Sequence, residues 1–183
     1  MERNVAQIAL FAALIAALGL VPKITLAFGV PITAQGMGIM LAGAMLGAKR
    51  GFLSVMLFLL LVAIGLPLLA GGRGGLAVFA GPTAGFLVGF PIAAFVTGWF
   101  VEHARLRHVG LRAFIGAVLG GVVVLYAFGI VGMSVSLGKS ISECTMLMAI
   151  FIPGDLLKAA ITGMLVAAIA KARPRALGWT ANA

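Results

Sequence analysis

Six stretches of mostly apolar residues, each bounded by charged residues or by glycine and proline, dominate the chain. A helix needs about 17–25 such residues to cross the hydrocarbon core of a bilayer. The pattern predicts an all-α integral membrane protein with six transmembrane helices, forming a single domain over residues 1–183. The expected helices lie near Val5–Val21, Ala34–Ala48, Phe52–Leu66, Pro82–Val101, Leu111–Val131 and Met146–Ala170. Because only Ala48–Gly51 separates the short second and third helices, we expect a tight hairpin there.

The composition supports a membrane protein. Hydrophobic residues make up 63% of the 183 positions and charged residues only 9%, against about half and about a quarter in soluble domains. A soluble fold of this size could not bury so much apolar surface. The single cysteine, Cys144, has no partner for an internal disulfide. The sequence shows no cluster of metal-ligating residues, so we expect neither a metal nor another cofactor.

The basic residues fall mainly on one side of the predicted topology. Three lie in the connections of one side: Lys23, Arg73 and Lys139. The other side holds Arg3, Lys49, Arg50, Arg105, Arg107, Arg112, Lys171, Arg173 and Arg175. The positive-inside rule makes the richer side cytoplasmic and places both termini there, in a multi-pass protein of the inner (plasma) membrane. Topology therefore accounts for the net charge of +9, and we expect no nucleic-acid partner.

Intramembrane charge is confined to one segment, Ile152–Lys158. A charged side chain near the centre of a spanning helix costs at least about 2.5 kcal/mol. Asp155 and Lys158 stand three residues apart, so on a helix they share a face and can neutralise each other. The pair is either a structural ion lock or an outward-opening site for a solute with N–H and C=O or carboxylate groups. Pro153 and Gly154 leave open whether the helix continues from Met146 or begins here.

The longer connections on the outer side are predicted at Pro22–Thr33, Pro67–Gly81 and Gly132–Thr145. The second contains the glycine run Ala70–Gly75. Without side chains, its backbone can approach a ligand closely. A flexible linker is the competing interpretation of this run.

Small residues recur every four positions in several predicted helices, which lets helices approach closely in lipid. For the glycines of the second, fourth and fifth helices we expect internal packing. Ala9, Ala13 and Ala17 of the first helix cover a broader face, which serves either packing or docking of another membrane protein. Because the sequence shows no nucleotide site or catalytic motif, a transport protein of this kind runs on a gradient or uses another protein's motor.

Two motifs of the chain are highly specific when they occur together: Gly-Pro-Thr-x-Gly at Gly81–Gly85 and Pro-Gly-Asp-x-x-Lys at Pro153–Lys158. They belong to a set of segments in order along the chain: Val30–Gln35, Leu41–Gly47, Lys49–Gly51, Gly65–Gly75, Phe79–Leu87 and Ile152–Ala159. This set resembles the BioY family, the biotin-specific substrate-binding subunits (S components) of energy-coupling-factor (ECF) transporters.

The resemblance implies a function in biotin uptake rather than an enzyme. The subunit would capture biotin at the outer face and deliver it with a T subunit and paired ABC-type ATPases, which dock on the alanine face. Homo-oligomerisation is left open. Asp155 and Lys158 would be the polar contacts. The family also supplies a polar residue from the loop between the third and fourth helices, and Arg73 is the nearest polar residue to that position here. The residues assigned to the substrate site are Asp155, Lys158, Arg73, Gly74, Phe79, Phe86 and Gln35.

Two biotin poses stay open: Asp155 and Lys158 bind the ureido group, or Lys158 pairs with the valerate carboxylate. Phe79, Phe86 and Leu87 would cover the apolar parts of the ligand. The alternative functions are an S component for another vitamin, an intramembrane enzyme using Asp155, and a structural subunit in which the pair only locks the last helix.

Overall fold

The computed structural model describes residues 2–25 and 29–179 and has helices at all six predicted segments. The first four are α1 (Glu2–Leu18), α2 (Gln35–Leu46), α3 (Ala48–Ala63) and α4 (Ala84–His103). The fifth runs through α5 (Val109–Val118), the π-helical turn η2 (Leu119–Val124) and α6 (Leu125–Leu137). The sixth runs through α7 (Ile141–Met148), the 3₁₀ turn η3 (Ala149–Phe151) and α8 (Ile152–Ala172).

We call each of these six continuous helical segments a rod. Within the described residues, three rods are long and apolar enough to cross a membrane: Ala84–His103, Val109–Leu137 and Ile141–Ala172. The remaining three, α1, α2 and α3, have 17, 12 and 16 residues. Short 3₁₀ helices, η1 (Leu76–Ala80) and η4 (Pro174–Ala176), lie in the connection before α4 and after α8. A two-stranded antiparallel ribbon pairs β1 (Ile24–Thr25) with β2 (Pro31–Ile32) in the predicted connection Pro22–Thr33; residues 26–28 of that connection lie outside the described residues.

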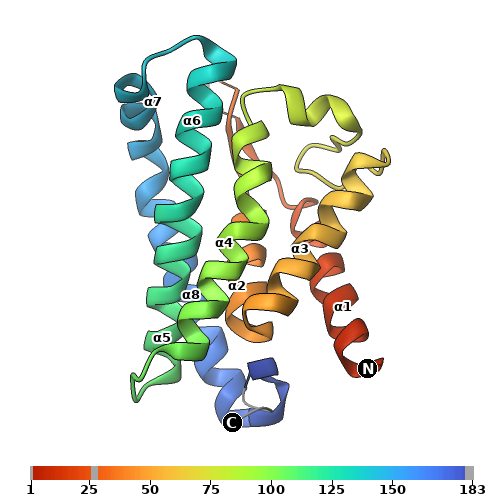
Figure 1. Ribbon diagram of the computed structural model, residues 1–183, viewed down its shortest axis with the longest axis vertical. Helices are drawn as coiled ribbons and strands as arrows, with labels where there is room; N and C mark the ends of the chain where they lie inside the picture. Colours follow the sequence, from red (N-terminus) through yellow and green to blue (C-terminus); the bar gives the residue numbers. More distant parts are fainter. Residues whose placement is uncertain (1, 26–28, 180–183) are drawn as a thin grey trace.

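The basic residues gather at one end of the bundle. Figure 1 shows the two ends of the described chain, the α2–α3 turn and the α4–α5 connection together at that end. The ribbon, the connection before α4 and the short α6–α7 link lie at the opposite end (Figure 1). We call the first the basic end, since its segments hold the nine basic residues grouped by the sequence pattern.

Two predicted connections are shorter than expected. Gly47 alone joins α2 to α3, with a φ of 84° that favours glycine, so Ala48, Lys49 and Arg50 begin α3 instead of forming a loop. On the other side, the predicted connection Gly132–Thr145 was wrong. Helix α6 continues to Leu137 and α7 starts at Ile141.

A capping box explains the early start of α7. The Ser140 hydroxyl accepts a hydrogen bond from the Glu143 amide at 3.3 Å. The Glu143 carboxylate accepts one from the Ser140 amide at 2.9 Å. Together they satisfy two backbone donors at the start of the helix, while Gly138 ends α6 in the left-handed conformation with a φ of 63°.

Glycines bring the helices into backbone contact, as the small-residue spacing predicted for the second, fourth and fifth helices. A Cβ on Gly43 of α2 would lie 2.3 Å from the carbonyl oxygen of Ala94 in α4. A Cβ on Gly85 of α4 would lie 2.8 Å from Cα of Gly132 in α6. By contrast, Ala9, Ala13 and Ala17 of α1 are exposed, while Ala12 and Ile15 on its other face are buried.

Candidate functional site

A pocket lies in the half of the bundle opposite the basic end. It measures about 650 Å³, counting the open space at its mouth. Its walls come from β2 and the start of α2, the loop before η1, the first two turns of α4 and α8, the start of α6, and the junction of α7 with η3. The lining residues are Val30, Pro31, Ile32, Thr33, Gln35, Gly36, Leu69, Ala70, Arg73, Thr83, Phe86, Leu87, Phe90, Leu125, Tyr126, Met148, Phe151, Asp155 and Lys158.

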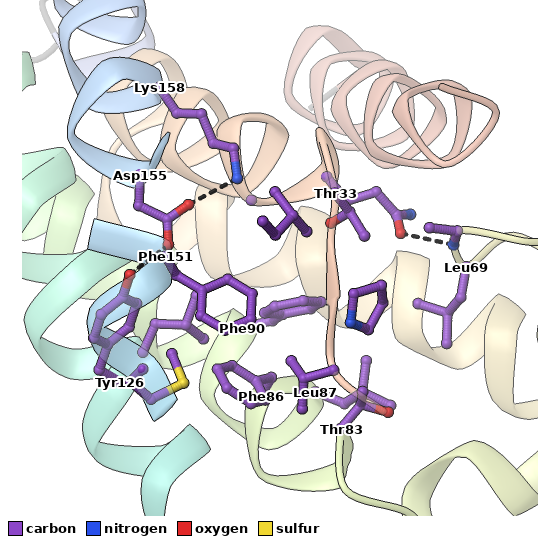
Figure 2. Close-up of a pocket in the computed structure, with 18 of the residues that line it drawn as sticks. Thr33, Leu69, Thr83, Phe86, Leu87, Phe90, Tyr126, Phe151, Asp155 and Lys158 are labelled. Carbon is purple, nitrogen blue, oxygen red and sulfur yellow. Dashed lines mark hydrogen bonds and ion pairs between the residues drawn. The ribbon is translucent and has the colours of Figure 1, made fainter. Parts of the chain in front are cut away.

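The polar wall of the pocket is a three-membered hydrogen-bond chain. The Lys158 ammonium lies 2.7 Å from Oδ1 of Asp155, and the Tyr126 hydroxyl donates to Oδ2 at 2.8 Å (Figure 2). The side chains of Lys158 and Asp155 are 18% and 13% exposed. Each carboxylate oxygen keeps a second lone pair, and the ammonium has further N–H groups. The wall therefore offers both acceptors and donors to a solute.

The local backbone explains why both charges face the pocket. Helix α8 begins at Ile152 with Pro153 in its first turn, where the missing proline amide costs no helical hydrogen bond. Asp155 stands in this first turn, where the helix dipole favours a negative charge. The 3₁₀ turn Ala149–Phe151 precedes it and joins α8 to α7. The helix thus continues from upstream, and Pro153 also begins its regular part.

Aromatic and aliphatic side chains form the rest of the lining. Figure 2 shows the rings of Phe86 and Phe90 from α4 between the Asp155–Lys158 wall and the side formed by Thr33 and Leu69. Phe86 is 9% and Leu87 2% exposed. Such surfaces suit the apolar body of a ligand whose polar groups reach the α8 wall.

Gln35 lines the pocket, but its amide group is committed to the backbone. Its Nε2 donates to the carbonyl oxygens of Ile15 at 3.1 Å and Leu68 at 3.0 Å. Its Oε1 accepts from the Ala70 amide at 3.0 Å. Since these bonds use both N–H groups, Gln35 joins α1, α2 and the loop before η1. It shapes the site and has no donor left for a solute.

The glycine run forms a tight turn that carries Arg73 back to the pocket. Leu69 and Arg73 exchange two backbone hydrogen bonds, of 3.0 and 3.2 Å. Gly71 and Gly72 between them have φ values of 82° and 68°, which only glycine adopts readily. The half-buried Arg73 side chain makes one long contact, from Nε to the Ala70 carbonyl at 3.5 Å. Its guanidinium therefore keeps donors for a ligand.

Five of the seven residues assigned from the sequence line the pocket: Asp155, Lys158, Arg73, Phe86 and Gln35. The other two do not. Gly74 packs against the backbone at Leu66, where a Cβ would lie 2.2 Å from the carbonyl oxygen. Phe79 lies in η1, half-buried against the main hydrophobic core.

Sequence reasoning missed Tyr126, which is the one tyrosine of the chain. A lone phenolic hydroxyl in an apolar helix is a signal that could have identified it, because a buried Tyr O–H needs a partner. It also missed Phe90 and Phe151, which look like ordinary apolar residues in the sequence. The π-helical turn Leu119–Val124 comes just before Leu125 and Tyr126, and such turns are frequent near functional sites.

Fold and pocket together define a helical membrane protein with a site for a small solute that carries both hydrogen-bond donors and acceptors. The family model of the BioY family matches residues 2–175. The chain therefore belongs to this family. Its relatives are named as transporters, in agreement with the prediction that the chain is not an enzyme.

Two curated relatives and one solved structure show how close the likeness is. The biotin transporter BioY of Rhodobacter capsulatus is 56% identical, over 97% of this chain and 98% of its own length. The biotin transporter BioY of Rhizobium etli is 51% identical, over 91% and 92%. A crystal structure of the S component for biotin from an ECF-type ABC transporter has a TM-score of 0.87 at 34% identity and covers 93% of this chain and 92% of that chain.

Proposed function

We propose that the chain is the biotin-binding S component of an ECF transporter and binds biotin in the pocket described above. The observation that carries the proposal is the Tyr126–Asp155–Lys158 chain on one wall of an otherwise apolar, aromatic pocket. A structural ion lock would need no pocket beside it. In addition, the chain aligns with two curated biotin transporters over nearly the whole length of each.

The lining favours one of the two biotin poses. Asp155 is the one carboxylate among the lining residues, so the ureido N–H groups find their acceptor there, while Lys158 donates to the ureido oxygen. The valerate carboxylate lies at the far end of the ligand. It therefore needs a cation away from this pair, and Arg73 on the loop before η1 supplies one.

The site assignment predicts the effect of three substitutions. Asp155→Asn and Lys158→Ala each leave one member of a half-buried pair without its partner, and each should weaken biotin binding by about 100-fold, or about 3 kcal/mol. Arg73→Ala should weaken biotin binding less, because its group lies at the looser end of the pocket. Isothermal titration calorimetry on purified protein measures all three, with the exposed Lys139→Ala as the matched control.

Biotin methyl ester separates the poses. If Arg73 binds the carboxylate, wild type should discriminate biotin from the ester, and Arg73→Ala should abolish that discrimination in a double-mutant cycle. Discrimination lost in Lys158→Ala alone would favour the other pose. Full binding by Asp155→Asn and Lys158→Ala would disprove the site, and binding of another vitamin in place of biotin would favour the alternative S component.

We also propose the wider arrangement that the sequence predicted. All six rods cross the inner membrane, and the basic end with both termini faces the cytoplasm. The exposed Ala9, Ala13 and Ala17 support a docking face for the T subunit of the ATPase module, since small side chains allow close helix approach. The orientation is tested in whole cells with single cysteines placed at each end and a thiol reagent that does not cross the membrane. Labelling of a cysteine at the basic end would show that this end faces outward, opposite to the proposal.

A further inference from the structure

A second cavity opens at the basic end, away from the pocket described above. It lies between the start of α1, the α2–α3 turn, the end of α4 and the segment after η4, and measures about 1490 Å³ with the open space at its mouth. Its lining residues are Arg3, Asn4, Leu46, Ala48, Lys49, Arg50, Phe95, Trp99, Glu102, His103, Gly178 and Trp179. The cavity plays no part in the proposed biotin site.

The charged groups of this cavity do not neutralise one another. Arg50 holds the fold together, donating to Asn4 Oδ1 at 3.0 Å, to Gln7 Oε1 at 3.3 Å and to the Gly178 carbonyl. The Glu102 carboxylate accepts a hydrogen bond from the Ala48 amide at 3.0 Å. Arg3 makes one long contact, to the Arg175 carbonyl at 3.5 Å.

Lys49 is the lining cation whose ammonium group is not engaged by the protein. Within residues 2–25 and 29–179, its ammonium has no hydrogen-bond acceptor and no carboxylate within salt-bridge distance. Arg3, Lys49 and Arg50 outnumber the one acidic residue of the lining, Glu102. The cavity thus has an excess of positive charge and an unpaired donor.

An apolar groove continues from the cavity along the outer face of α3 and α4. It is lined by Lys49, Phe52, Leu53 and Phe95 and measures about 510 Å³ with its open space. Lys49 and Phe95 line both hollows. The Phe52 and Phe95 rings meet edge to face at 6.5 Å. Beside them, near the end of α4, the Trp99 ring stacks on His103 at 5.1 Å, and tryptophans near helix ends are typical of membrane interfaces.

We propose that the cavity and groove together bind one anionic phospholipid. Its phosphate head group lies between Lys49 and Arg3, and an acyl chain follows Phe52, Leu53 and Phe95. The argument is charge complementarity along a continuous surface that is cationic at the helix ends and apolar beside them. Basic pockets between helices at the cytoplasmic side suit such head groups. A zwitterionic lipid would bring its own ammonium toward Lys49, so the surface should distinguish the two.

Tryptophan fluorescence gives a local readout, because both tryptophans of the sequence, Trp99 and Trp179, line this cavity. In Trp179→Phe the signal comes from Trp99, one helical turn from Phe95. Purified protein is placed in bilayers of unlabelled phosphatidylcholine. Increasing amounts of a lipid with brominated acyl chains are then added, either phosphatidylglycerol or phosphatidylcholine. We expect brominated phosphatidylglycerol to quench Trp99 with about fivefold higher apparent affinity, because one basic residue near the head group contributes roughly that factor.

Lys49→Gln should remove this preference, while Lys171→Gln should keep it. Lys171 is the matched control because it is an exposed lysine at the same end of the bundle, on α8. Biotin binding, which this surface does not touch, checks that each variant is folded. Equal quenching by the two lipids, or a preference that survives Lys49→Gln, would overturn the proposal.

Displacement of brominated phosphatidylglycerol by millimolar inorganic phosphate would show a free-phosphate site instead. If Lys49→Gln impaired only association with partner subunits and left the lipid preference intact, the surface would be a protein interface and the proposal wrong.

Discussion

At the residue scale, Tyr126 decides how Asp155 is presented to a solute. The carboxylate receives the Lys158 ammonium on Oδ1 and the Tyr126 hydroxyl on Oδ2. Lys158 lies on α8 with Asp155, and Tyr126 lies on α6, so the two contacts hold the carboxylate from two directions. Because hydrogen bonding arranges the acceptor before a ligand arrives, less side-chain entropy is lost on binding.

Tyr126→Phe removes one hydroxyl and keeps the ring. A hydrogen bond to a charged group contributes about 1.5–3 kcal/mol, and a ligand donor replaces part of it. We therefore expect biotin affinity to fall about tenfold, with the ring packing preserved. Titration calorimetry measures the loss. Ser134→Ala is the control, since it deletes a hydroxyl of the same helix that bonds the Lys139 carbonyl outside the pocket. Unchanged affinity in Tyr126→Phe would show that Lys158 alone holds the carboxylate.

Asp155 and Lys158 could be predicted from the sequence because they are the charges that interrupt an apolar run. Tyr126 and Phe151 could not be placed beside them in the same way. The Tyr126–Asp155 contact joins residues from different helices, 29 positions apart, and local sequence carries no record of such a pairing. Gln35 was assigned to the site through the resemblance to the BioY family. Only the contacts of its amide show that it holds the backbone.

At the scale of elements, helix existence followed from hydropathy, whereas helix ends depended on single residues. Apolar runs placed all six rods because their composition alone distinguishes them. Gly47 shortened the α2–α3 connection by adopting a positive φ, which the sequence allows but does not require. The π-helical turn Leu119–Val124 has an ordinary apolar sequence. Its Gly120 lies close to α4 and its Gly121 close to α2, and such contacts between distant segments are not visible in the local sequence.

Helix packing makes a testable prediction at Gly43. Because a Cβ there would meet the Ala94 carbonyl at 2.3 Å, Gly43→Ala should push α2 from α4 and lower the free energy of unfolding by about 1–3 kcal/mol. Gly81→Ala is the matched control, since a Cβ at Gly81 meets no atom within 4 Å among the described residues and its φ of −99° suits alanine. Thermal unfolding in detergent compares the two. Equal midpoints would mean that the helices accommodate the methyl group.

At the scale of the whole molecule, the solute pocket, the basic end and the alanine face occupy separate regions. The pocket uses the beginnings of α2, α4, α6 and α8. The exposed alanines lie along α1, at the far side of the bundle from α6 in Figure 1. This separation lets a partner subunit bind α1 without contacting the ligand. Binding and delivery of biotin should therefore be separable by mutation.

Ala13→Leu tests that separation. The larger side chain stands on the exposed face of α1, so it should leave the bundle and biotin affinity unchanged, while its bulk blocks close approach of a partner helix. We expect at least tenfold less co-purification with the T subunit and a matching loss of ATPase-dependent biotin uptake in cells. Ala127→Leu is the control, because Ala127 is equally an exposed alanine but lies on α6. Normal uptake and co-purification in Ala13→Leu would remove α1 as the docking face. Uptake at the wild-type rate in cells without the ATPase subunits would go further, because it would show that this subunit moves biotin without the motor.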